Sequence, residues 1–479
     1  MRWWIGPERL AVRFSATETA EMFVPGRMFV RLRPWLDRFD TMLRGENERA
    51  VAQRMSLIAF AIRIVSAAIA FVSQVVLARW MGGFEYGIYV LVWVTAVILG
   101  NISCFGFHTA VIRFLPEYRE TGDLDALRGV LITSRMFALL ASTTVAVGGA
   151  LAIWAFSADI ADYYVVPFIL GAICLPMIAL GDVLDGTARA NSWPVFALTP
   201  TYILRPLLIL ALMIAAHVAG FESSARTALL AAIAATYMTS VLQLVTVTAN
   251  LDKRYPAGPR RTELKLWVSV ALPIFLVEGF FFLLTNADVL MVGRFLPPED
   301  VGVYFATVKT LALVHFVYFA VKAGAAQRFA GLMGNNDKSG LAAFARETVQ
   351  WTFWPSLAMG LALLVFGKLL LSLFGESFTA GYPLLFVLVA GVVARASVGP
   401  AESLLSMSGN QNACAAVYGL TLALNIALNF WLIPVYGLAG AAISTTIAML
   451  FESLALAIVI RRRLGIVMFV FAPRDGRAA

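Results

Sequence analysis

Charged side chains lie inside long apolar stretches of this sequence, where they are costly. The ionisable residues within these stretches are Arg63, Arg135, Arg205, Glu278, Asp288, Lys309, His315, Lys368, Arg395 and Glu452. A basic residue at the centre of a membrane-spanning helix costs about 2.5–3.5 kcal/mol on insertion scales. Several such residues facing lipid would offset a whole fold's stability, so most of them must face water, a partner or a ligand.

Five of the basic residues indicate an anionic ligand, and they are Arg63, Arg135, Arg205, Lys309 and Arg395. The guanidinium group is a planar fork that matches phosphate oxygens, so we predict that these residues bind a diphosphate in a cavity. An alternative for Arg63, Arg135 or Arg395 taken singly is snorkelling, because each lies roughly 10 Å from a predicted helix end.

The apolar stretches are long enough to be membrane-spanning helices. Of the 479 residues, 60% are hydrophobic and 14% are charged, which is far from the composition of a soluble domain. A span needs about 20 helical residues. The predicted spans are 56–78, 86–107, 129–155, 163–181, 196–216, 227–249, 267–292, 303–321, 351–374, 381–400, 413–433 and 437–460. We therefore expect an all-α polytopic membrane protein of about twelve helices.

Loop charges predict the orientation. With the N-terminus inside, thirteen Lys and Arg residues fall in the short inner loops and three, Arg79, Arg226 and Arg294, in the outer loops. This asymmetry follows the positive-inside rule. An even number of spans then places both termini in the cytoplasm.

The chain repeats itself at a shift of 215 residues. Glu85, Gly87 and Tyr89 fall on Asp300, Gly302 and Tyr304. The copies have the same orientation, because an even number of helices separates them. We predict two six-helix lobes, 51–251 and 252–460, around a central cavity, as in a transporter that works by alternating access.

The same shift superimposes Arg63 on Glu278. Residues at equivalent positions can approach each other near the axis that relates the lobes, so we predict a gating latch between them. Asp288 joins them as a gating or ion-coupling residue. A static pair, or two residues that never meet, is the alternative.

The sequence carries no signature of catalysis, metal binding or a cofactor. Cys104, Cys174 and Cys414 all lie in apolar runs, and the three histidines lack metal-ligand spacing. Asp123 and Asp125 form a weak D-x-D pattern that is more typical of a capped helix start. We expect neither a catalytic site nor a metal, cofactor or nucleic-acid partner.

Four segments resemble a known family: ARWMGGFEYGIYVL, ADVLMVGRFLPPEDVGVYFAT, FLPEYRETGDLDALRG and NFWLIPVYGLAGAAISTTIAM. In order and spacing they are similar to polysaccharide flippases of the multidrug/oligosaccharidyl-lipid/polysaccharide exporter superfamily, over residues 52–462.

The resemblance implies a flippase of the bacterial inner membrane that moves polyprenyl-diphosphate-linked glycan units from the cytoplasmic to the periplasmic leaflet. It places Arg63, Glu278, Asp288 and Lys309 on the cavity-lining helices. A lipid-linked anionic glycan is then the substrate, and membrane lipids and polysaccharide polymerases are the implied partners. Coupling to protons, sodium or the membrane potential stays open.

Two other functions stay open at this point. A cation-coupled multidrug-type antiporter of the same superfamily carries an acid in its first helix, where this chain has Arg63. A membrane glycosyltransferase or polymerase would have only the D-x-D pattern to support it.

The two ends of the chain are basic. Residues 1–50 form an extension in which the spacing of 27–44 predicts an amphipathic helix on the inner leaflet, with a disordered leader as the alternative. Residues 461–479 form a basic tail whose apolar stretch is too short to span.

Overall fold

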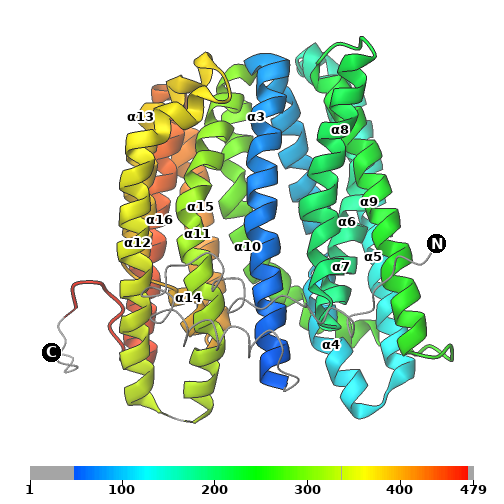
Figure 1. Cartoon of the computed structure of the whole chain (residues 1–479), viewed down its shortest axis with the longest axis vertical. Coiled ribbons are helices and arrows are strands. Elements are labelled where there is room, and N and C mark those ends of the chain that lie inside the picture. Colours follow the sequence, from blue (N-terminus) through cyan, green and yellow to red (C-terminus); the bar gives the residue numbers. More distant parts are fainter. Residues whose placement is uncertain (1–47, 336, 473–479) are drawn as a thin grey trace, which may run out of the picture.

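The computed structural model describes residues 48–335 and 337–472. Within these ranges the chain is almost entirely helical, and eleven helical stretches are long and apolar enough to cross a membrane (Figure 1). The predicted all-α membrane architecture is thereby confirmed. The predicted amphipathic helix at 27–44 lies outside the described residues.

The first two predicted spans form one helical hairpin, α3 (Glu48–Ile102). The chain reverses at Gly82, whose φ of 73° lies in the left-handed region that favours glycine. The Tyr86 hydroxyl donates to Gln74 Oε1 at 2.9 Å, although twelve residues of straight helix would separate them by about 18 Å. One of the eleven stretches contains both helical legs of this hairpin, so the eleven stretches correspond to the twelve predicted spans.

The remaining helices follow the predicted order. They are α4 (Phe107–Thr121), α5 (Leu124–Ala155), α6 (Asp162–Ala190), α7 (Pro194–Thr199), α8 (Arg205–Val218), α9 (Ala225–Arg254), α10 (Leu264–Phe295), α11 (Pro298–Gly334), α12 (Lys338–Ser372), α13 (Tyr382–Ala396), α14 (Ala401–Met407), α15 (Gln411–Tyr436) and α16 (Leu438–Leu464). A short 3-10 turn, η4 (Glu376–Gly381), precedes α13.

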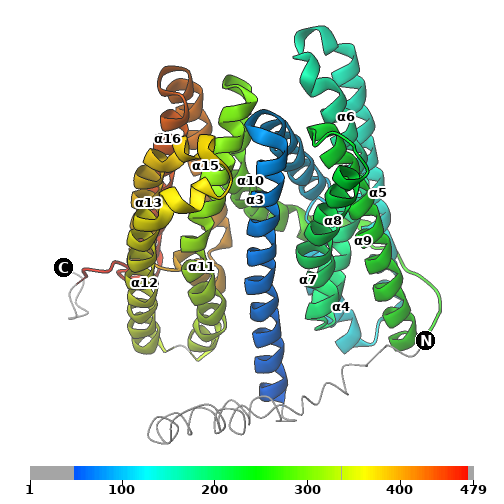
Figure 2. The ribbon, with the colours of Figure 1, turned by 45° about the horizontal axis from the view of Figure 1, so that its top comes forward.

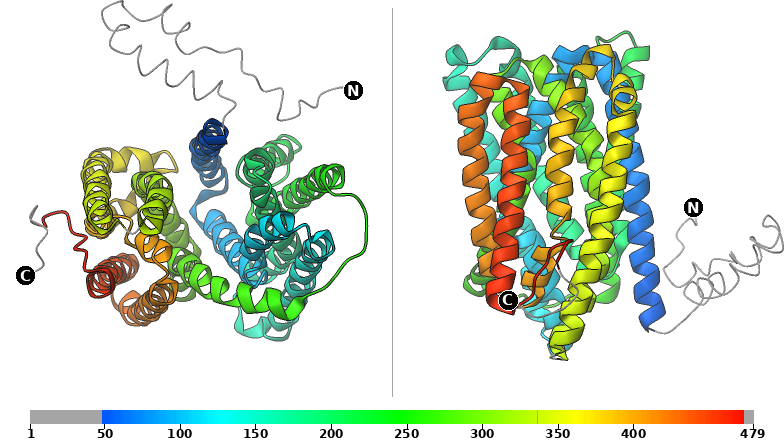
Figure 3. Two further views of the ribbon diagram at one scale, coloured as in Figure 1. Left: turned by 90° about the horizontal axis from the view of Figure 1, so that it is seen from below. Right: turned by 90° about the vertical axis from the view of Figure 1, so that its left-hand side faces the viewer.

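The helices gather into two groups, which we call the N-half (α3 to α9) and the C-half (α10 to α16). In the N-half α6 packs on α3, α5 and α9, and in the C-half α16 packs on α13 and α15. Seen along the bundle, the first leg of α3 stands between the two groups (Figure 3). The numerical lobe boundaries 51–251 and 252–460 stay predictions.

The start of α10 packs on the N-half. Trp267 is fully buried in a cluster formed by α4, α5, α6 and α9, and its indole N–H donates to the Tyr118 hydroxyl at 2.9 Å. The preceding linker is tied down as well, since Arg261 N–H donates to the Asp125 carbonyl at 2.9 Å. From this anchorage α10 runs obliquely to the C-half (Figures 2 and 3). Pro273 lies inside the helix where it leaves the N-half.

Candidate functional site

A cavity of about 500 Å³ lies between the two halves. Residues of α3, α4, α10, α11, α14 and α15 line it: Asn101, His108, Val277, Glu278, Phe281, Phe282, Lys322, Ala326, Glu402, Ser403, Ser406, Met407, Cys414 and Tyr418. Because α4 and α14 both lie in the lower part of Figure 1, we call this end of the bundle the α4 end. The opposite end, where α3 reverses, is the Gly82 end.

Two basic side chains flank one aromatic ring beside this cavity. The Lys322 ammonium lies 5.3 Å and the Arg395 guanidinium 5.7 Å from the centre of the Phe281 ring. Lys322 forms an ion pair with Glu402, whose side chain is buried. Since Lys322 is only partly covered, its charge is available to an anion that enters the cavity.

Arg395 is held more deeply than Lys322. Its guanidinium pairs with the buried Glu452 at 3.0 Å and lies 4.9 Å above the Tyr318 ring. Its Nη2 makes this pair, whereas its Nε is buried and has no hydrogen-bond partner among the described residues. Unpaired guanidinium N–H groups in such a place are donors that an anionic ligand can use.

Glu278 connects the C-half to the N-half across the cavity. Its Oε2 accepts a hydrogen bond from Thr109 Oγ1 at 2.6 Å and lies 3.4 Å from His108 Nε2. Arg63 is exposed, and its side chain makes no ion pair with Glu278 in this structure. The Arg63–Glu278 latch therefore stays a prediction for another state, while Glu278 does bridge the halves through α4.

Asp288 belongs to a second polar cluster, inside the C-half. Its Oδ2 accepts from Thr445 Oγ1 at 2.6 Å and its Oδ1 from Asn429 Nδ2 at 3.2 Å. Asn429 also donates to Asn425 Oδ1 at 3.0 Å. All but Thr445 are nearly inaccessible, and Asn429 Oδ1 is a buried acceptor without a partner in the described part of the chain. A carboxylate with converging side-chain oxygens is suited to a proton or a small hard cation.

The Gly82 end of the bundle is closed by the two copies of the sequence repeat. A Cβ on Gly87 would lie 1.7 Å from the Pro298 carbonyl oxygen, and one on Gly302 would lie 3.1 Å from the Gly83 carbonyl oxygen. A shift of 215 converts Gly83 to position 298 and Gly87 to position 302. Equivalent positions thus cross each other reciprocally, as expected for lobes related by a twofold axis.

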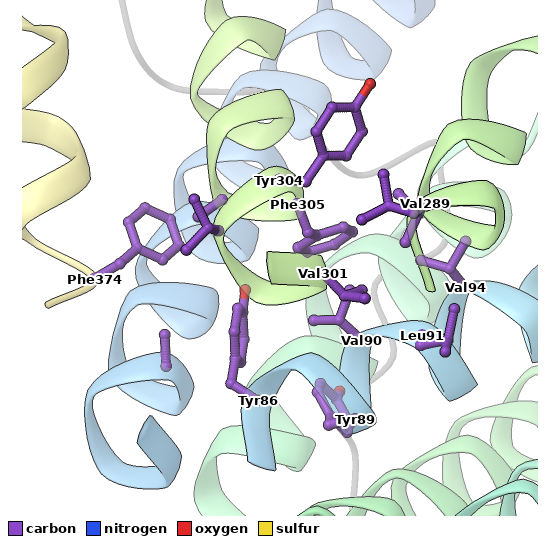
Figure 4. Packing of buried hydrophobic residues seen from close by; sticks show 14 of the residues in the cluster. Tyr86, Tyr89, Val90, Leu91, Val94, Val289, Val301, Tyr304, Phe305 and Phe374 are labelled. Atoms are coloured by element: carbon purple, nitrogen blue, oxygen red, sulfur yellow. The ribbon is translucent and has the colours of Figure 1, made fainter. Parts of the chain in front are cut away.

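Large side chains complete this closure, which we call the seal. Tyr86 and Tyr89 of α3 and Val301 and Tyr304 of α11 are at most 1% exposed (Figure 4). The Tyr86 ring also lies edge-on to Phe378 at 5.8 Å.

Above the seal, Arg79 caps the C-terminal end of α12. It donates from Nε to the Leu373 carbonyl at 2.5 Å and from Nη2 to that of Ser372 at 3.2 Å. Among the described residues, the seal therefore separates the cavity at the α4 end from a pocket beside Arg79 at the Gly82 end.

The other predicted cations lie apart from this cavity. Arg205, 7% exposed, points at Gly181 inside the N-half, where a Cβ would lie 3.4 Å from its Nη2. Arg135 donates to Thr248 Oγ1 at 3.1 Å. Lys309 is exposed and lies 4.8 Å from the centre of the Phe305 ring. Of the five predicted cations, Arg395 alone shares an aromatic contact with the cavity wall.

Sequence reasoning missed three residues of this site: His108, Lys322 and Glu402. Lys322 fell just beyond a hydropathy-defined span, whereas α11 continues to Gly334. Glu402 lies in the short helix α14, which follows the apolar run of α13. Charged residues just outside the apolar runs were the available signal for Lys322 and Glu402.

The D-x-D pattern caps a helix, as its position indicated. Asp123 is the N-cap of α5 and accepts from the backbone N–H of Ala126 at 3.1 Å. This hydrogen bond, together with Arg261, lowers the pKa of Asp123. Asp125 pairs with Arg128 at 2.8 Å. Within the described ranges no cluster of three His, Cys, Asp or Glu residues is placed to hold a metal.

Two family models match the sequence. The model described as polysaccharide biosynthesis protein matches residues 54–326, and the model described as MatE matches residues 273–431. A comparison with curated proteins finds no match.

Solved structures share the fold. A multidrug resistance MATE family transporter of the MOP superfamily, in an inward-facing conformation, is 13% identical, with 83% of this chain and 94% of that chain covered and a TM-score of 0.72. The lipid II flippase MurJ, in an inward closed conformation, is 12% identical, with 85% and 87% covered and a TM-score of 0.64. A MOP superfamily transporter from Pyrococcus furiosus Vc1 is 14% identical, with 89% and 97% covered and a TM-score of 0.60.

Proposed function

Because the chain belongs to the polysaccharide biosynthesis protein family, we propose that it is a flippase for polyprenyl-diphosphate-linked glycan units. The observation that carries this proposal is the cavity between the halves, with Lys322 in its wall and Arg395 behind Phe281, opposite a sealed far end. Such a site takes an anionic headgroup from one side of a membrane only.

The positive-inside charges support a direction. They assign the α4 end to the cytoplasm and the Gly82 end to the periplasm of a bacterial inner membrane, with both termini cytoplasmic. The headgroup then enters from the cytoplasmic leaflet, the cavity closes beneath it, and the seal opens toward the periplasm. Polymerases that extend the delivered glycan are the expected partners.

The buried acids make the cationic side chains selective for a diphosphate over an uncharged headgroup. A diphosphate offers Lys322 more charge than Glu402 does, so it competes for the ammonium and leaves a buried carboxylate without its partner. An uncharged lipid-linked sugar cannot do this. Arg63, Arg135, Arg205 and Lys309 remain proposed contacts for other states of the cycle.

Asp288 is the proposed coupling residue. Its cluster is separate from the cavity, so a proton or cation can bind there while the headgroup occupies the site. Coupling requires that binding at Asp288 differs between the two states of the bundle.

A second candidate function is a cation-coupled antiporter for small molecules. The MatE match to residues 273–431 favours it, because that region contains Asp288, Asn425 and Asn429. The two candidates differ in cargo, and one experiment separates them.

The test reconstitutes the full chain in vesicles with a fluorescent polyprenyl-diphosphate-linked sugar and measures its movement between leaflets. Movement is expected with the wild type, and the double variant Lys322→Gln/Glu402→Gln should slow it at least about tenfold without leaving an unpaired buried charge. Lys338→Gln, at the exposed start of α12, is the control. Movement of a cationic dye that is driven by a proton gradient of opposite direction, with no movement of the lipid, would instead establish the antiporter.

A further inference from the structure

The chain after α16 doubles back as an extended strap, residues 465–472, along the C-half. Gly465 turns the chain with a φ of 69°, which a residue with a side chain adopts only with strain. Ile466, Met468 and Val470 are buried in the core of the C-half, whereas Val467, Phe469 and Phe471 are 39%, 45% and 69% exposed. This alternation is the pattern of an extended segment with one face on the bundle.

The strap is fixed by hydrogen bonds as well as by packing. Val470 N–H donates to the Ser397 carbonyl at 3.0 Å, and Gln350 Nε2 donates to the Val470 carbonyl at 2.8 Å. Phe471 packs edge-on against Phe353 at 5.9 Å. The strap therefore crosses from α16 over the end of α13 to α12.

A groove of about 360 Å³ lies between the strap, α13 and α16. Its volume is within the range of about 300–1,000 Å³ typical of ligand sites. Leu450, Leu454 and Ile458 in its wall are 42% to 63% exposed, so the groove opens to the lipid phase rather than to the interior. Val467 and Phe469 supply an apolar rim on the opposite side.

Among the described residues, charge lies at the end of this groove where α16 ends. Its wall includes Arg461, and the last turn of α16 continues with the exposed Arg462 and Arg463. An apolar slot that opens to lipid and ends at consecutive arginines matches the two parts of an anionic phospholipid.

We propose that this groove binds an anionic phospholipid, with one acyl chain between the strap and α16 and the headgroup at Arg461 and the adjacent Arg462. The bound lipid covers the exposed face of the strap and holds it against α12 and α13. The site is independent of the transport cavity, because its lining shares no residue with that cavity.

Native mass spectrometry of the full-length chain tests the proposal with phosphatidylglycerol and phosphatidylcholine of identical acyl chains. The wild type should retain phosphatidylglycerol under activation that removes phosphatidylcholine. Arg461→Gln/Arg462→Gln should lower the apparent affinity for phosphatidylglycerol about tenfold and abolish the preference between headgroups. Ala457→Trp, which fills the groove and keeps the arginines, should lower the binding of both lipids.

The matched control is Arg113→Gln/Arg119→Gln, which removes two exposed arginines from α4, far from the groove. It should retain the phosphatidylglycerol preference. Equal binding of the two lipids by the wild type, or wild-type binding by the Arg461/Arg462 variant, would overturn the proposal. So would unchanged binding by Ala457→Trp, or a lipid-free dimer that Ala457→Trp dissociates, since the groove would then be an interface between copies.

Discussion

At the scale of single residues, the site contains ion pairs whose acidic side chains are buried away from water. Glu452 is 2% exposed and lies 3.0 Å from Arg395, and Glu402 is equally sheltered against Lys322. Each pair is tolerated in the bundle because neither charge is alone. The same pairing means that an anionic ligand competes with a carboxylate for each cation.

The Arg395–Glu452 pair makes a prediction about stability. Arg395→Gln leaves Glu452 buried without a counter-charge and should lower the free energy of unfolding by about 3–5 kcal/mol. The double variant Arg395→Gln/Glu452→Gln should recover most of this loss. Denaturant unfolding in detergent measures both, and a double variant that is as unstable as the single one would contradict the pairing argument.

The cap at Asp123 makes a prediction about pH. Its folded-state pKa is lowered, by the Ala126 N–H first and Arg261 next, so it stabilises the fold above its unfolded pKa of about 3.9. That contribution disappears as the pH falls through the lower folded-state pKa. Asp123→Ala should therefore lower Tm by a constant amount from pH 7 to pH 5, and the difference should shrink at more acidic pH. A difference that grows on acidification would show that the cap has the opposite sign.

At the scale of helices, glycine decides how closely α3 and α11 approach. In a helix interior glycine costs roughly 0.5–1 kcal/mol relative to alanine. Gly87 is retained at a place where any Cβ would overlap the Pro298 carbonyl, so its cost is offset by the close crossing it permits. The close approach of α3 and α11 in the seal therefore requires a glycine at this position.

Gly87→Ala should open the seal. The overlap with backbone costs about 1–3 kcal/mol, which corresponds to roughly 5- to 150-fold more of the state that is open at the Gly82 end. In a Val301→Cys background, labelling by a membrane-impermeant maleimide should rise accordingly, since Val301 is fully buried in the seal and the three native cysteines are buried.

The matched control for this experiment is Gly149→Ala, a helical position where nothing lies within 4 Å of the added Cβ. It should leave the labelling of Val301→Cys unchanged. Equal labelling of the two alanine variants would remove the seal from the gating argument.

Most elements could be predicted from the sequence, because span length and hydropathy are local properties. The reversal within α3 was marked by Gly82 and Gly83, but the place of α10 was not readable. Trp267 is the first residue of an apolar stretch that the sequence assigns to the C-half. In the structure it packs among N-half residues that are distant in sequence.

The candidate site was less predictable than the fold for the same reason. Arg395 and Asp288 could be predicted as site residues because they are charged residues within apolar stretches. The residues that contact Glu278 could not be predicted from the sequence. Glu278 and His108 are 170 positions apart, and no period in the sequence relates them. The repeat pairs Glu278 with Arg63, yet in this structure Glu278 contacts His108 and Thr109 of α4 instead.

At the scale of the whole molecule, the orientation makes a prediction. Arg260 in the linker and Ala158 in the loop after α5 are both exposed, and the loop charges place them on opposite sides of the membrane. In intact cells, Ala158→Cys should react with an impermeant thiol reagent and Arg260→Cys should not. Arg260 suits this test better than Gly258, where an added Cβ would meet the Arg128 guanidinium. The reverse labelling would invert the proposed direction of transport.

The reciprocal crossing of Gly87 and Pro298 has a consequence for how the protein is made. Ribosomes add about 5–20 residues per second, so roughly 10–40 s pass between the synthesis of these two positions. During that time the face of α3 that contains Gly87 lies in the membrane without α11 to cover it. The two copies cross as near-equivalents, so a second nascent chain presents a surface similar to the missing one. We expect a fragment that ends at residue 251 to dimerise through this face, and a cysteine in place of Phe84 to crosslink in the fragment but not in the complete chain.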